Sequence, residues 1–207
     1  PLNPLLQSFR DLQSLGHSRA MLRVALGSAF FWTLASITQL AVDAYGIKVL
    51  RLSQNDVGPL VGVLALGVAI GNVLAGVWSR GRVELGLVPL AATALSVSAV
   101  SLFFTHGVFI SGCGLFCLGV SAGMFDVPLA SYLQHRSPPE KRGAIISAAN
   151  LMTYSGMLLA SLAFEIVQHP RGTEQLPLLT PRGIFLCAGM LSLPVAIYAF
   201  TILPLAT

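Results

Sequence analysis

Five stretches without any Asp, Glu, Lys or Arg dominate this sequence of 207 residues, namely 24–42, 57–79, 85–125, 143–164 and 183–207. A helix needs about 20 apolar residues to cross the hydrocarbon core of a bilayer, so four of these stretches fit one span each. The stretch 85–125 fits two spans separated by a tight turn at Thr105-His106-Gly107. Only a helix satisfies its own backbone hydrogen bonds in lipid. The sequence therefore predicts an all-α, polytopic membrane protein, a bundle of six transmembrane helices.

The charged residues outside these stretches predict the orientation of the bundle. We place the spans at about 22–42, 57–79, 85–104, 108–134, 143–164 and 183–203. The ends on the N-terminal side of spans one, three and five hold eight basic residues: Arg10, Arg19, Arg23, Arg80, Arg82, Arg136, Lys141 and Arg142. The opposite loops hold four: Lys48, Arg51, Arg171 and Arg182. By the positive-inside rule both termini are expected in the cytoplasm.

Residues 1–20 precede the first span, and we expect them to form a separate cytoplasmic segment beside a membrane domain at 21–207. Leu5, Leu6, Phe9, Leu12 and Leu15 form an apolar stripe. That pattern suits a short amphipathic helix on the membrane surface, and a flexible linker is the alternative. Because the sequence opens on a proline rather than a methionine, we expect it to be a fragment of a longer protein.

Two local signals predict how the helices pack and where one begins. Small-xxx-small pairs at 58/62 and 67/71 lie on opposite faces of the second span, which predicts close helix packing on both faces. Ser137, followed by Pro138 and by Glu140 three residues later, is typical of a helix N-terminus. We therefore expect the fifth helix to begin at residue 138.

A few polar side chains lie inside the apolar spans, and they are the candidate substrate-binding residues: Gln39, Asn72, Asp126, Asn150 and Tyr154. Polar groups are costly in hydrocarbon, so they usually face a bundle interior or a cavity. Hydrogen bonding between helices is the alternative for the amides and Tyr154, and a place near the cytoplasmic helix end is the alternative for Asp126. No pattern predicts catalytic residues, a metal site or a cofactor, and no basic cluster with interleaved aromatics predicts nucleic-acid binding.

The turn between the second and third spans resembles the conserved loop of the major facilitator superfamily, G-x-x-x-D-R-x-G-R-R. We assign Gly76, Arg80, Gly81, Arg82 and Glu84 to a candidate gating loop. Gly76 matches the pattern, whereas Arg80 stands where the acid belongs, which leaves a charge relay at this loop unsupported. The segment 138–143 is similar to the P-x-x-x-R-G motif that precedes the fifth span of a half-transporter. The resemblance implies the C-terminal half of a transporter whose partner is an N-terminal six-helix half.

Three segments, 28–32, 81–89 and 123–129, resemble the lysophospholipid transporter branch of that superfamily, as does the place of Asn150 early in the fifth span. This resemblance implies transport of lysophospholipids or similar amphiphiles across the bacterial inner membrane by alternating access. It also implies that this chain is not an enzyme, although an acyltransferase is often fused to it in that branch. The alternatives are a facilitator for another hydrophobic molecule, the membrane part of an enzyme, or a free-standing six-span protein that dimerises.

Overall fold

A computed structural model of the chain describes residues 11–13, 15–16, 18–79, 86–169 and 177–202. These residues form six long helices and no strand, as the charge-free stretches predict. The helices are α2 (Arg19–Lys48), α3 (Gly58–Ser79), α4 (Leu87–Phe104), α5 (Val108–Arg136), α6 (Arg142–Gln168) and α7 (Pro181–Ile202). All six are long and apolar enough to cross a membrane. The predicted turn at 105–107 is confirmed, and Gly107 takes a positive φ of 90° there, which favours glycine.

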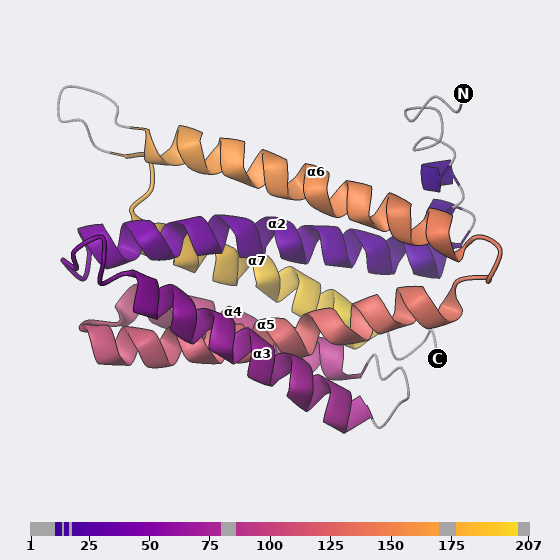
Figure 1. Cartoon of the computed structure of the whole chain (residues 1–207), viewed down its shortest axis with the longest axis horizontal. Coiled ribbons are helices and arrows are strands. Elements are labelled where there is room, and N and C mark those ends of the chain that lie inside the picture. Colours follow the sequence, from indigo (N-terminus) through magenta and orange to yellow (C-terminus); the bar gives the residue numbers. More distant parts are fainter. Residues whose placement is uncertain (1–10, 14, 17, 80–85, 170–176, 203–207) are drawn as a thin grey trace.

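The helices associate chiefly as three pairs: α2 with α6 and α3 with α5, which run parallel, and α4 with α7, which run antiparallel (Figure 1). Helices α2, α4 and α6 begin at the end of the bundle that holds Arg19, and α3, α5 and α7 end there. We call this the Arg19 end and the opposite one the Lys48 end. Since the number of spans is even, the first and last helices place their outer residues at the same end of the bundle.

Glycines bring α3 and α5 to backbone contact. A methyl group added at Gly71 would lie 2.9 Å from the carbonyl carbon of Val120, and one at Gly123 would lie 2.7 Å from the backbone nitrogen of Asn72. The prediction of close packing is therefore confirmed for the 67/71 pair. It is wrong for Gly58 and Gly62, which have open space around the Cβ position.

The predicted start of the fifth helix is also wrong. Ser137 is the C-cap of α5, and its hydroxyl donates to the carbonyl of Leu133 at 2.5 Å. Helix α6 begins at Arg142, after a turn in which the backbone N–H of Lys141 donates to Pro138. Ser137, which we expected to cap the start of the fifth helix, therefore lies at the C-terminal end of the fourth.

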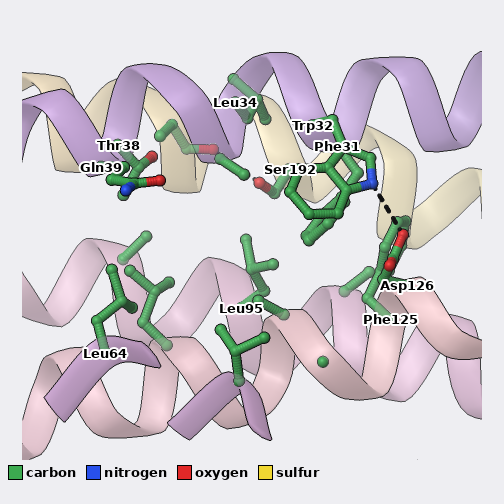
Figure 2. Close-up of a pocket in the computed structure, with 18 of the residues that line it drawn as sticks. Phe31, Trp32, Leu34, Thr38, Gln39, Leu64, Leu95, Phe125, Asp126 and Ser192 are labelled. Carbon is green, nitrogen blue, oxygen red and sulfur yellow. Dashed lines mark hydrogen bonds between the residues drawn. The ribbon is translucent and has the colours of Figure 1, made fainter. Parts of the chain in front are cut away.

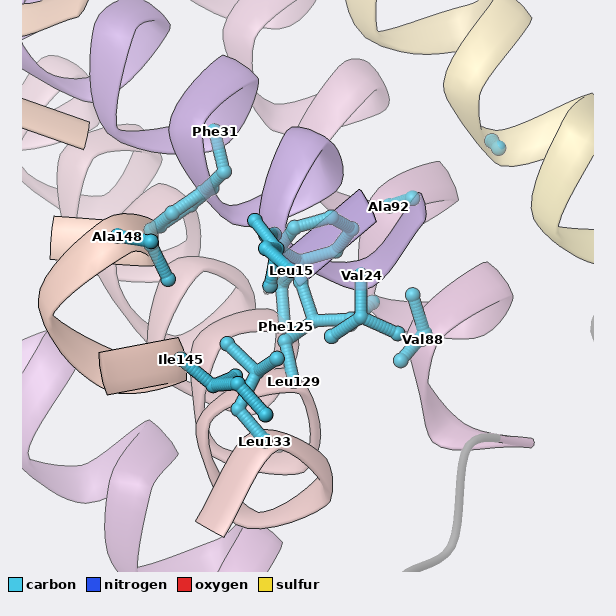
Figure 3. Packing of buried hydrophobic residues seen from close by; sticks show 14 residues of the cluster. Leu15, Val24, Phe31, Val88, Ala92, Phe125, Leu129, Leu133, Ile145 and Ala148 are labelled. Carbon is cyan, nitrogen blue, oxygen red and sulfur yellow. The ribbon is translucent and has the colours of Figure 1, made fainter. Parts of the chain in front are cut away.

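Two clusters of buried apolar side chains hold the two ends of the bundle together. The cluster at the Arg19 end includes Val24, Phe125 and Leu129, and Leu15 of the preceding segment is fully buried in it (Figure 3). Leu15, one residue of the apolar stripe in that segment, thus faces the bundle, and whether the segment as a whole is a surface helix or a linker stays a prediction. Tyr45 and Phe185 are the largest members of the cluster at the Lys48 end, and their rings pack edge to face.

Candidate functional site

A cavity of about 440 Å³ lies between α2 and the α3–α5 pair, with residues of α4 and α7 completing its wall. Its volume is in the range of typical small-molecule sites. The lining is mainly apolar, as Leu34, Leu64 and Leu95 show, and polar side chains are few (Figure 2). This arrangement follows from the packing, because α5 lies against α3 at backbone distance whereas α2 lies chiefly on α6.

Three of the five predicted binding residues line this cavity: Gln39 from α2, Asn72 from α3 and Asp126 from α5. They come from three different helices, and sequence spacing alone does not bring them together. Asn72 lies against Gly123, and its side-chain oxygen would be 2.8 Å from a methyl group placed there. Gln39 and Thr38 lie toward one end of the cavity and Asp126 toward the other (Figure 2).

Asp126 lies well inside the length of its helix. At about 1.5 Å per residue, it is roughly 15 Å from the end of α5 at Arg136 and roughly 27 Å from the end at Val108. A hydrocarbon core of about 30 Å centred on this helix would extend to within roughly 7 Å of either end. Asp126 would then lie about 8 Å inside the nearer boundary, so its place in the helix favours the cavity interpretation over a residue at the membrane surface.

The indole of Trp32 holds the Asp126 side chain across the cavity. Nε1 of Trp32 donates a hydrogen bond of 3.0 Å to Oδ1 of Asp126, which joins α2 to α5 (Figure 2). The ring of Phe31 packs edge to face on Trp32 with centroids 5.5 Å apart, and it lies tilted against the ring of Phe125 with centroids 5.0 Å apart. One end of the cavity therefore combines a carboxylate with several aromatic rings.

Asn150 and Tyr154 do not belong to this group. Both lie on an exposed face of α6, where the Tyr154 side chain is 68% exposed, and neither lines the cavity. The two residues share an i,i+4 face of α6, and neither contributes to the cavity that the other three residues line. A role for them in substrate binding stays a prediction.

The candidate gating loop is described only in part. Gly76 lies in α3, is exposed, and has open space around its Cβ position. Helix α3 packs on α5, and α4 packs on α7 and α5. Arg80, Gly81, Arg82 and Glu84 lie outside the described residues.

Sequence reasoning missed the role of two lining side chains, Trp32 and Ser192. Trp32 belongs to the segment 28–32 that resembles the lysophospholipid transporter branch. Its indole N–H did not mark it as a binding residue, because indoles are common in apolar helices. Ser192 lines the cavity, but its hydroxyl already donates to the carbonyl of Ala188 at 2.8 Å in its own helix. Trp32 is the more informative of the two, since its donor is turned toward a carboxylate.

Comparison with known proteins agrees with this architecture. The chain is 27% identical over 151 residues to the major myo-inositol transporter IolT of Bacillus subtilis, an alignment that covers 70% of this chain and 32% of that protein. It is 28% identical over 120 residues to the probable metabolite transport protein YBR241C of Saccharomyces cerevisiae, which covers 57% of this chain and 24% of that protein. The chain thus spans about a third and about a quarter of the lengths of these two relatives.

A family model described as Major Facilitator Superfamily matches residues 2–161. That range includes α2 to α5 and most of α6, and with them the Gln39, Asn72 and Asp126 side chains of the cavity. The six membrane-spanning helices and this match over most of its length show that the chain is a multi-pass membrane domain and belongs to the major facilitator superfamily.

Proposed function

We propose that this chain is the C-terminal half of a transporter that moves lysophospholipids or similar amphiphiles across a bacterial inner membrane by alternating access. The observation that carries the proposal is the composition of the cavity. Long apolar walls, with polar side chains confined to a few positions, suit a substrate that has both an acyl chain and a polar head.

A polyol would need a different site. Each hydroxyl group of such a substrate loses its hydrogen bonds to water on binding, and a buried group without a partner costs about 1–3 kcal/mol. Beside Asp126, Gln39 and Asn72, the polar side chains of the lining are Thr38, Ser192 and the Trp32 indole. Trp32 and Ser192 already donate to partners within the chain, so few donors remain for a ring of hydroxyl groups.

The proposal includes an N-terminal six-helix half as the partner of this domain. A passage that opens alternately to the two sides needs a second half to complete its wall. The cavity is bordered by exposed side chains of α2 and α3, including Gln39 and Asn72, which a second half would cover. Both termini of this half are proposed to face the cytoplasm, and a downstream acyltransferase is part of the same proposal for the full-length protein.

A second candidate is a transporter of a small polar metabolite, and the similarity to a myo-inositol transporter and a probable metabolite transport protein favours it. The two candidates differ in which solute competes for the cavity. Binding of a fluorescent lysophospholipid that excess myo-inositol displaces would favour the metabolite. Binding that only other lysophospholipids displace would favour the amphiphile.

The test of transport uses the full-length protein that contains this chain, reconstituted in vesicles with lysophosphatidylethanolamine carrying a fluorescent acyl chain. We expect movement between leaflets well above that of protein-free vesicles. Ala65→Phe should block it, because Ala65 is exposed and lines the cavity. Leu66→Phe is the matched control, since Leu66 is 56% exposed and does not line the cavity. Transport no faster than in protein-free vesicles, with folded protein, would refute the proposal.

A further inference from the structure

The Asp126 end of the cavity carries a negative charge without a positive partner among the described residues. Oδ1 of Asp126 accepts a hydrogen bond from the indole N–H of Trp32 at 3.0 Å, and no group in the described part of the chain is recorded as a partner of Oδ2. The described lining contains no Lys, Arg or His. An indole is a neutral donor, so it orients the carboxylate without compensating its charge.

An uncompensated carboxylate at this depth is costly, and such groups usually mark the path of a substrate or an ion. Asp126 is partly buried, and Oδ2 is not among the fully buried, unpartnered polar atoms of the described chain. The second oxygen is therefore accessible from the cavity. A cation that enters the cavity would be attracted by the negative charge of Asp126 and could bind to Oδ2.

The aromatic side chains around Asp126 suit the same kind of ligand. Trp32, Phe31 and Phe125 all line the cavity at this end, and the ring of Phe31 contacts the rings of the other two (Figure 2). Aromatic faces attract organic cations, ammonium groups in particular, through their quadrupoles. A small inorganic cation would instead need several oxygen ligands, and Asp126 is the only carboxylate in the described lining.

We propose that Asp126, positioned by Trp32, forms a subsite for the ammonium group of the transported substrate. This inference rests on the proposed function and narrows it, because it selects amphiphiles whose polar head carries a primary or quaternary amine. A primary ammonium group donates to Oδ2 of Asp126, whereas a quaternary one, which has no N–H, is held by the charge of the carboxylate and by the aromatic faces. The aromatic rings cover the carbon atoms next to the nitrogen. The acyl chain then extends along Leu95 and Leu64 toward the Gln39 end of the cavity (Figure 2).

The experiment compares lysophosphatidylethanolamine with its N-acetyl derivative, in which a neutral acetamide replaces the ammonium group while the phosphate and the acyl chain are kept. Binding to the purified full-length protein is measured by competition with the fluorescent lysophospholipid. We expect the amine to bind about tenfold or more tightly, since a hydrogen bond to a charged group contributes more than a neutral one. Asp126→Asn should remove this preference and leave the affinity for the acetylated ligand unchanged.

Two further variants keep the test decisive if Asp126→Asn folds poorly. Trp32→Phe removes the indole donor but keeps an aromatic ring, and we expect it to reduce the preference for the amine about threefold or more, because the carboxylate is no longer held in place. Asp43→Asn is the matched control, because Asp43 is an exposed carboxylate of α2 outside the cavity. It should bind both ligands as the unaltered protein does.

Each outcome separates this inference from the proposed function. If neither lysophospholipid binds or moves, the proposed function fails and the subsite fails with it. If both ligands bind and move equally well, transport stands and the subsite is refuted. If a proton gradient speeds transport of both ligands, and Asp126→Asn slows both alike to a rate that the gradient no longer changes, Asp126 carries protons and the ammonium subsite is refuted.

Discussion

Replacing Gly71 with alanine should separate helices α3 and α5, and the structure gives the size of the effect. The new methyl carbon would lie 2.9 Å from the carbonyl carbon of Val120 and 3.0 Å from its Cα. Carbon atoms pack best at about 3.5–4.0 Å, so the two helices must move apart by roughly 0.5–1 Å. A gap of that size forfeits about a quarter to a half of the attraction of each affected contact.

Two terms set the expected change in the free energy of unfolding. Overpacking of a well-packed interface costs about 1–3 kcal/mol. Alanine is favoured over glycine in a helix by about 1 kcal/mol, which offsets part of that cost. Gly62→Ala is the matched control, since it gains the same helix propensity on the same helix and meets nothing within 4 Å. We therefore expect Gly71→Ala to be less stable than Gly62→Ala by about 1–3 kcal/mol.

The assay is thermal unfolding of the two purified full-length variants in the same detergent, followed by tryptophan fluorescence. For chains of this size about 1 kcal/mol corresponds to roughly 2–4 °C in Tm, so the difference should be several degrees. Because the clash is with the backbone of Val120, shortening its side chain by Val120→Ala should not rescue Gly71→Ala. Equal melting temperatures for Gly71→Ala and Gly62→Ala would refute the packing argument.

Three other predictions concern the Lys48 end of the bundle and the orientation of the chain. Tyr45→Phe should lower the free energy of unfolding by about 1 kcal/mol, because the Tyr45 hydroxyl forms a hydrogen bond of 2.8 Å with the buried hydroxyl of Ser111 in α5. Tyr154→Phe is the control at an exposed site and should leave Tm unchanged. Gly107→Ala should cost about 1–2 kcal/mol, because a residue with a Cβ is strained at a φ of 90°; an unchanged Tm would contradict this. Cysteines at Glu140 and Gln54 should react with a membrane-impermeant maleimide from opposite sides, Glu140→Cys from the cytoplasm, and labelling from the same side would contradict the six-span topology.

The six spans could be predicted because the absence of charge over about 20 residues is a local property of the sequence. The division of the stretch 85–125 into two spans was also predictable, because the turn between them depends only on the local residues 105–107. The start of α6 was not, because the signal at Ser137 is ambiguous from sequence. The same hydroxyl that could cap a following helix donates instead to Leu133 one turn earlier, and the burial of Ser137 in the bundle decides between the two.

The candidate site was predictable only in its residue types. The rule that polar groups in apolar helices are candidates selected Gln39, Asn72 and Asp126, which line the cavity. The same rule selected Asn150, which does not line it. Helical spacing tells which residues share a face, but the neighbours of that face depend on how all the helices pack. The hydrogen bond from Trp32 joins residues 94 positions apart in the sequence, and no local pattern indicates it.

The packing of α5 explains why Asp126 faces a cavity rather than a neighbouring helix. On one side, Gly119 and Gly123 bring its backbone against α3, so that face has no room for side chains. Asp126 lies three residues after Gly123, about 300° around the helix, and therefore projects from the border of this contact toward the space beside α2. A closer approach of α2 would bury the carboxylate against apolar rings without a counter-charge, which is strongly unfavourable. The indole of Trp32 bridges the remaining distance, and the cavity keeps the second oxygen available to a cationic ligand.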